Sequence, residues 1–147
     1  MGARRIARER ALQALYQLDL QGEGPSVRDA LEAAWGSETE GAEAATGAIA
    51  PDMKQFALEL VEGVRQKLAE LDAQIEKHST NWRIDRMSRI DRNVLRLGAY
   101  ELAHRPDVPK KVALNEAVEL GKKFGTEESS SFINGLLDKL AQGIDKP

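Results

Sequence analysis

Arginines gather at the start of the sequence, where their spacing could bind phosphate. Residues 1–10 hold four arginines and one glutamate. On a helix with Arg4 at 0°, Arg5 lies at about 100° and Arg8 at about 40°, and the apolar Leu12 and Leu15 follow at about 80° and 20°. The arginines therefore continue the direction of an apolar stripe. Because charges do not enter a core without partners, we expect these three arginines to project beyond the edge of the core as a basic lip.

Phosphate binding is the chemistry that this basic lip suits best. A guanidinium group contacts phosphate oxygens in a bidentate manner and stacks on unpaired bases. The alternative is a helix end that is simply solvated. Cations in the first turn of a helix oppose its dipole, which makes this alternative less favourable. The residue types alone therefore favour a polyanionic ligand and leave the solvated end open.

Other charged or aromatic positions favour structural roles. The segment R-I-D-R occurs at 83–86 and again at 89–92, where an ion pair between Arg89 and Asp85 on one helix is favoured over contact with RNA. Lys110 and Lys111 start a predicted helix, which again costs free energy unless an anion is near. Phe132 continues an apolar stripe, so on pattern alone it belongs to the core.

Nothing in the sequence predicts an enzyme. Cysteine is absent, and the two histidines, His78 and His104, each lie near a predicted helix end, where a protonated imidazole is favourable on dipole grounds alone. The sequence contains no G-x-G-x-x-G, P-loop or H-E-x-x-H motif. We therefore expect no catalytic residue, no metal site and no cofactor.

The sequence predicts an all-α fold, a compact bundle of six or seven helices forming one domain over residues 1–147. Apolar residues recur at steps of three and four, and no alternating strand pattern occurs. Residues 36–50 are rich in Gly, Ala and Glu, lack this period and are interpreted as a mobile loop. The third helix is the longest, ending near Lys77, and a short segment follows around Trp82. The expected helices begin near Ala3, Ser26, Asp52, Ser88, Lys110 and Thr126, with Ser26, Ser88 and Thr126 as caps and Gly125 as the stop of the fifth.

The net charge is −3, but acidic and basic residues cluster in different segments of the chain. Residues 19–43 hold seven acidic residues and one arginine, whereas residues 83–96 are rich in arginine. Because partners respond to the local field, such a chain can bind a polyanion. No signal-peptide core follows the basic start, and no run of about 18 apolar residues occurs. We therefore expect a cytoplasmic protein without a membrane span.

Four blocks of this sequence resemble the NusB family of bacterial transcription antitermination factors. They occur in the family's order, which makes the resemblance specific, and residues 22–50 carry little of it. The blocks are R-R-I-A-R-E-R-A-L-Q-A-L-Y (Arg4–Tyr16), R-N-V-L-R-L-G-A-Y-E-L (Arg92–Leu102), D-V-P-K-K-V-A-L-N-E-A-V-E-L-G-K-K-F-G (Asp107–Gly125) and F-I-N-G-L-L-D (Phe132–Asp138).

The resemblance implies an all-helical fold of two packed subdomains and a non-enzymatic role. In this family the protein pairs with NusE, a small-subunit ribosomal protein, and the pair binds the single-stranded boxA element of nascent RNA. The assembly modifies RNA polymerase so that it reads through terminators, notably in ribosomal RNA operons. Some members form homodimers that cover the RNA face, and the sequence leaves this state open. By motif position, the RNA contacts fall on Arg4, Arg5, Arg8, Lys111 and Phe132, and the NusE contacts fall near Tyr16 and Asp91.

Two other classes of protein fit the sequence less well. Some ribosomal RNA methyltransferases resemble NusB in their N-terminal part, but they need a long cofactor-binding α/β region afterwards, and this chain ends at Pro147. A helix-turn-helix regulator of DNA would need a recognition helix with exposed base-reading groups, and no pair of short helices here has that character. The RNA-binding antitermination factor is the favoured interpretation.

Overall fold

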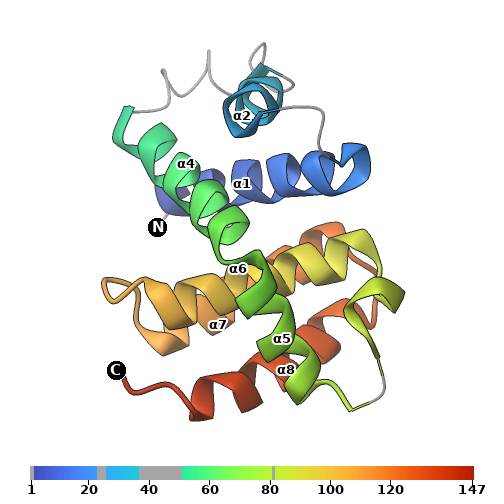
Figure 1. Ribbon diagram of the computed structural model, residues 1–147. Coiled ribbons are helices and arrows are strands. Elements are labelled where there is room, and N and C mark those ends of the chain that lie inside the picture. Colours follow the sequence, from blue (N-terminus) through green and yellow to red (C-terminus); the bar gives the residue numbers. More distant parts are fainter. Residues whose placement is uncertain (1, 23–25, 37–50, 81) are drawn as a thin grey trace. The chain divides into compact units, whose positions relative to one another are not determined.

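The computed structural model describes residues 2–22, 26–36, 51–80 and 82–147, and every regular element in these ranges is helical (Figure 1). This confirms the predicted all-α fold. The loop expected over residues 36–50 lies, from residue 37 onwards, outside the described residues. The elements are α1 (Gly2–Gln21), α2 (Val27–Gly36), α4 (Pro51–Gln66), α5 (Leu68–His78), the 3₁₀ turn η2 (Ile84–Arg86), α6 (Arg89–His104), α7 (Lys110–Phe124) and α8 (Ser129–Gln142).

The chain divides into two compact units, an N-terminal unit over residues 1–62 and a C-terminal unit over residues 63–147. This is the kind of division that the family resemblance implied. The boundary falls inside α4, which therefore contributes its first part to one unit and its last turn to the other.

The N-terminal unit is built on α1, which packs against α2. Leu12, Leu15 and Leu18 are buried on the predicted stripe of α1. The helix ends where Gly22 adopts a positive φ of 74°, which a residue without a Cβ reaches at little cost. Ser26 caps α2 as predicted, because its Oγ accepts a hydrogen bond of 3.0 Å from the Asp29 backbone N–H.

The C-terminal unit is formed by α6, α7 and α8, which all contact one another, and by α5, which packs on α6 and α8. Gly98 allows this close packing, since a Cβ added there would lie 2.6 Å from Leu137 Cδ1 and 3.2 Å from Ala117 Cβ. Each fully buried leucine or isoleucine contributes about 1.5–3 kcal/mol through removal of apolar surface from water. The largest buried side chains here are Leu71, Ile75, Leu95, Leu97, Leu102, Ile133 and Leu137.

The single long helix predicted from Asp52 to Lys77 is wrong, because the chain forms α4 and α5 instead. Lys67 interrupts the helix with φ −104° and ψ 16°. Hydrogen bonds of helical type still reach across it, from Lys67 N to the Gly63 carbonyl and from Leu71 N to the Lys67 carbonyl. The break is therefore confined to one residue, and it preserves the apolar spacing on both sides.

The turn between α7 and α8 also differs from the prediction. Thr126 does not cap the last helix, which begins three residues later at Ser129. Instead, the Thr126 backbone N–H donates to Ser129 Oγ at 2.9 Å. Gly125 follows the end of α7 as predicted, but its φ is −98°. A side chain is excluded there by space, because an added Cβ would lie 2.3 Å from Ser129 Oγ.

Candidate nucleic-acid interface

The basic lip predicted at the start of α1 keeps Arg5, which is exposed, and Arg4, which is partly exposed, but not Arg8. Arg8 is only 3% exposed, and its guanidinium carbon lies 5.4 Å from the centre of the Phe56 ring on α4. The Arg4 guanidinium lies 4.3 Å from the same ring centre. A cation above an aromatic face recovers part of the free energy lost on leaving water, which is why Arg8 can follow the apolar stripe inward. The expectation that all three arginines project beyond the core is therefore wrong for Arg8.

Arg5 is the exposed member of the three, and Arg4 is partly exposed. Tyr16, a predicted partner contact, lies three turns further along α1 and is also partly exposed. Ideal helix geometry places Tyr16 about 20° from the direction of Arg5 and about 16 Å along the axis. The N-terminal unit therefore offers Arg5 and Tyr16 on one strip of α1.

Phe132 lies at the start of α8 and is partly exposed rather than part of the buried core. It lines two cavities of the C-terminal unit, of about 260 Å³ and about 200 Å³. Trp82 also lines both. The core role that pattern alone gave to Phe132 is therefore wrong: the ring borders open space on two sides.

The smaller of these cavities, here called the Asp91 cavity, brings together residues predicted to bind different ligands. Asp91 and Phe132 both line it, with Trp82, Arg86, Met87, Ser88, Thr126 and Glu128. Ser88 caps α6 as predicted, since its Oγ accepts from the Asp91 backbone N–H at 3.1 Å. The side-chain Oδ1 of Asp91 is buried and has no hydrogen-bond partner among the described residues. A buried acceptor of this kind is stabilised by a donor from a ligand.

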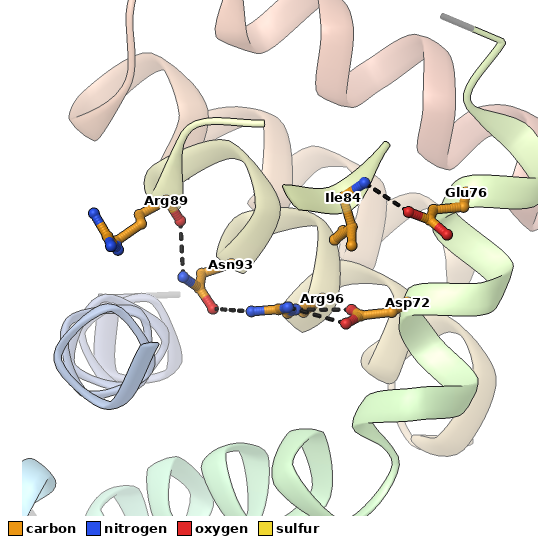
Figure 2. A network of polar contacts seen from close by, with 6 residues as sticks. All are labelled: Asp72, Glu76, Ile84, Arg89, Asn93 and Arg96. Carbon is orange, nitrogen blue, oxygen red and sulfur yellow. Dashed lines mark hydrogen bonds and ion pairs between the residues drawn. The ribbon is translucent and has the colours of Figure 1, made fainter. Parts of the chain in front are cut away.

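A polar network joins α5 to α6 and to the segment around Ile84 (Figure 2). Arg96 on α6 donates to both carboxylate oxygens of Asp72 on α5, at 2.8 and 3.0 Å. The Glu76 carboxylate accepts from the backbone N–H of Ile84 at 2.8 Å. Asn93, itself buried, accepts from Arg96 and donates to the Arg89 carbonyl. These bonds fix the start of α6, and with it Asp91, relative to α5.

Lys111, the remaining predicted RNA contact, is exposed near the start of α7. The start of α7 lies next to the C-terminus, because the Lys110 backbone N–H donates to the Pro147 carbonyl at 2.8 Å. Phe132 is the fourth residue of α8, which follows the turn at the other end of α7. With a rise of 1.5 Å per residue, α7 separates its two ends by about 20 Å. The structure does not bring Lys111 and Phe132 together.

The ion pair expected between Arg89 and Asp85 needed one helix through both residues. The chain instead leaves η2 after Arg86 and starts α6 at Arg89. Asp85 lies 3.7 Å from Arg83, with both side chains largely exposed. This arrangement leaves Arg83, Arg86 and Arg89 exposed.

The two histidines lie beside different groups. His104 Nε2 lies 2.5 Å from Glu70 Oε2, and His78 lines the larger cavity. Within the described ranges, no group of three or more His, Asp or Glu side chains is placed to hold a metal ion.

Burial lowers the pKa of Lys146, whose Nζ donates to the carbonyls of Glu101 and Arg105. Of the helices described, none has the length and apolar character needed to cross a bilayer.

The sequence predicted only a short connecting segment around Trp82, whose side chain lines both cavities together with Phe132. The side chain is 53% exposed. The signal available in the sequence was a tryptophan next to an arginine in a segment between two predicted helices, since tryptophan and arginine are enriched at interfaces.

The comparisons with known proteins agree with this architecture. A profile described as the NusB family matches residues 5–142. The "Transcription antitermination protein NusB" of Myxococcus xanthus is 58% identical over 147 residues, covering all of both chains. The protein of the same name from Sorangium cellulosum is 47% identical, covering 99% of this chain and 96% of its own.

Solved structures resemble the fold over nearly the whole chain. A NusB from T. maritima superposes with a TM-score of 0.82 at 30% identity, covering 98% of this chain and 93% of its own. A structure described as the antitermination factors NusB and NusE in complex with dsRNA gives 0.80 at 28% identity, covering 97% and 98%. Because the family profile and full-length relatives agree with the helical fold, the chain belongs to the NusB family of transcription antitermination factors.

Proposed function

We propose that this chain is an RNA-binding antitermination factor that binds a boxA-type single-stranded RNA together with a NusE-type protein. The pair acts on RNA polymerase to promote read-through, notably in ribosomal RNA operons. The structural neighbour described with NusE and dsRNA supports both classes of ligand for this chain. We assign the RNA contacts to Arg4, Arg5, Arg8, Lys111 and Phe132, and the NusE contacts to Tyr16 and Asp91.

The observation that carries the proposal is that Asp91 and Phe132 line one cavity. A ligand protein that supplies a donor to Asp91 and an RNA that stacks on Phe132 would then lie against each other. Such neighbouring ligands can strengthen each other's binding without a change in the fold. Arg5, exposed on α1, supplies a cation of the kind that phosphate contacts require.

Arg8 is the buried member of these proposed RNA contacts. Because it is buried against Phe56, it supports the first turns of α1 and adds positive potential behind Arg4 and Arg5. Its contact with a phosphate would require the side chain to leave the ring. We therefore expect Arg5 to contribute more to the dependence of binding on salt.

Fluorescence anisotropy with a labelled boxA-type RNA tests this function. Affinity is expected to fall with salt, with a slope in the logarithmic plot of about −0.7 per phosphate contact. Single-stranded RNA should compete well, whereas duplex DNA of equal length should compete poorly. Equal competition by both would contradict RNA recognition. Sedimentation of the free protein in the same buffer would show whether it forms a homodimer.

A further inference from the structure

Trp82 is a large apolar side chain that lies outside the buried core. It is 53% exposed, whereas the other tryptophan, Trp35, is 6% exposed. An exposed indole ring offers a broad flat face at a low cost in side-chain entropy, which is why tryptophans gather at binding sites. Trp82 lines both cavities of the C-terminal unit together with Phe132.

The backbone that carries Trp82 is held on both sides of the residue. Ser79 Oγ donates to the Trp82 carbonyl at 2.7 Å and accepts from the Trp82 N–H at 3.3 Å. Two residues later, the Ile84 N–H donates to the Glu76 carboxylate (Figure 2). These bonds hold the segment on α5, so a ligand that binds the ring has less backbone to order.

The larger cavity has the composition of a site for a base and its phosphate. Trp82 and Phe132 supply aromatic rings, Ser131 supplies a hydroxyl group, and His78 and Lys139 supply groups that can carry positive charge. None of the described residues that line it has a carboxylate. The Asp91 cavity, by contrast, is lined by two carboxylates, Asp91 and Glu128, and by a single cation, Arg86, so the charge of its lining disfavours phosphate. We call the larger cavity the carboxylate-free cavity.

We propose that the carboxylate-free cavity binds one unpaired nucleobase of RNA, stacked on Trp82, with the neighbouring phosphate held by Lys139. This inference rests on the proposed RNA binding and extends it to two residues beyond the predicted contacts. Phe132, the predicted RNA contact on α8, also lines this cavity. Its volume of about 260 Å³ lies just below the range of about 300–1,000 Å³ of whole-ligand pockets, so it suits a single ring system.

Intrinsic fluorescence tests the stacking directly, because the chain has two tryptophans and only Trp82 is exposed. Titration of the full chain with a boxA-type single-stranded RNA should quench its emission and protect it from acrylamide. The Trp82→Ala variant should lose the quenching and bind RNA about tenfold more weakly, since one stacked base is worth about that factor or more. Trp82→Phe should retain most of the affinity, because the phenyl ring still stacks.

Salt dependence separates stacking from charge. Trp82→Ala should lower the affinity without changing the salt slope, whereas Lys139→Gln should reduce the slope by about one phosphate contact. Gly135→Leu obstructs the cavity from α8, where an added Cβ meets no atom within 4 Å; it should weaken RNA binding while the protein stays folded. Leu20→Ala, which removes another exposed apolar side chain, is the matched control and should bind RNA normally.

The outcomes distinguish this inference from the proposed function. If RNA binds with its usual salt slope but Trp82→Ala and Gly135→Leu keep full affinity, the nucleobase site is overturned and RNA binding stands. If these variants lose a NusE-type partner and keep RNA, the cavity is a protein-docking site and the inference is again wrong. If the unaltered chain binds no RNA at all, the proposed function fails and the inference falls with it.

Discussion

Asp91 on α6 and Phe132 on α8 line the same cavity, although one is a predicted contact for a protein and the other for RNA. The buried Oδ1 of Asp91 has no hydrogen-bond partner in the described part of the chain, and the ring of Phe132 borders open space. One end of the C-terminal unit thus combines an acceptor suited to a protein donor with a ring suited to a base. This proximity gives a physical route for coupling between two ligands.

Replacing Asp91 by Asn is expected to weaken a NusE-type partner and to spare RNA. The amide removes the negative charge and halves the acceptor capacity of the side chain, which should lower partner affinity about tenfold. Isothermal titration with the partner alone and with RNA alone measures the two effects separately. Asp85→Asn, an exposed carboxylate near Arg83, is the control. Unchanged partner affinity in Asp91→Asn would remove Asp91 from the interface.

Arg5 and Arg8 should respond differently to substitution. Arg5→Glu is expected to weaken RNA binding about tenfold and to flatten its salt dependence, because an exposed phosphate contact is lost. Arg8→Ala should instead lower the free energy of unfolding by about 1–2 kcal/mol, since a buried stem and a cation–π contact with Phe56 disappear. Urea unfolding and anisotropy on both variants separate these outcomes. Arg65→Glu, an exposed position on α4, should change neither quantity appreciably.

The Asp72–Arg96 pair is expected to stabilise the C-terminal unit. Its side chains are 22% and 11% exposed, and removing one partner leaves a partly buried charge unpaired. Asp72→Ala should therefore lower the free energy of unfolding by about 2–3 kcal/mol. Asp85→Ala at the surface should change it by less than about 0.5 kcal/mol. A double-mutant cycle with Arg96→Ala measures the coupling, and additive losses would contradict a direct interaction.

Two glycines in helices should respond to alanine with opposite signs. Gly98→Ala places a Cβ against Leu137 and Ala117, and this overpacking should lower the free energy of unfolding by about 1–3 kcal/mol. This loss should exceed the gain from the higher helix propensity of alanine. Gly135→Ala meets nothing within 4 Å and should stabilise α8 by up to about 1 kcal/mol. Thermal unfolding of both variants checks the sign, and a stabilising Gly98→Ala would contradict the close packing of α6.

The sequence predicted the helices well wherever apolar period and end signals agreed. The predicted start of α7 at Lys110 and its end at Phe124 are confirmed, and so are the serine caps of α2 and α6. These helix ends and caps depend on interactions among a few residues that are neighbours in the sequence. The break at Lys67 is marked by neither glycine nor proline. The late start of α8 depends on a turn in which Thr126 and Ser129 bond to each other before the helix begins.

The candidate site was less predictable for the same reason. Helical angles showed that Arg8 follows the apolar stripe, but only the fold shows that Phe56 provides an aromatic face for it. The exposure of Trp82 results from a turn between α5 and η2, which the sequence pattern does not specify. Asp91 and Phe132 are distant in sequence, and the packing of α6 on α8 brings them to one cavity.

The most direct measurement compares two affinities. One is the affinity of the chain for a boxA-type RNA, measured with and without a saturating NusE-type partner. The other is its affinity for that partner, measured with and without saturating RNA. The two ligands should strengthen each other by the same factor, as linkage requires, and a factor of about ten is expected for a coupling within the usual 1–3 kcal/mol. Asp91→Asn should reduce this factor. Independent binding of the two ligands, with no change in either affinity, would contradict the account of this chain as an adaptor between RNA and protein.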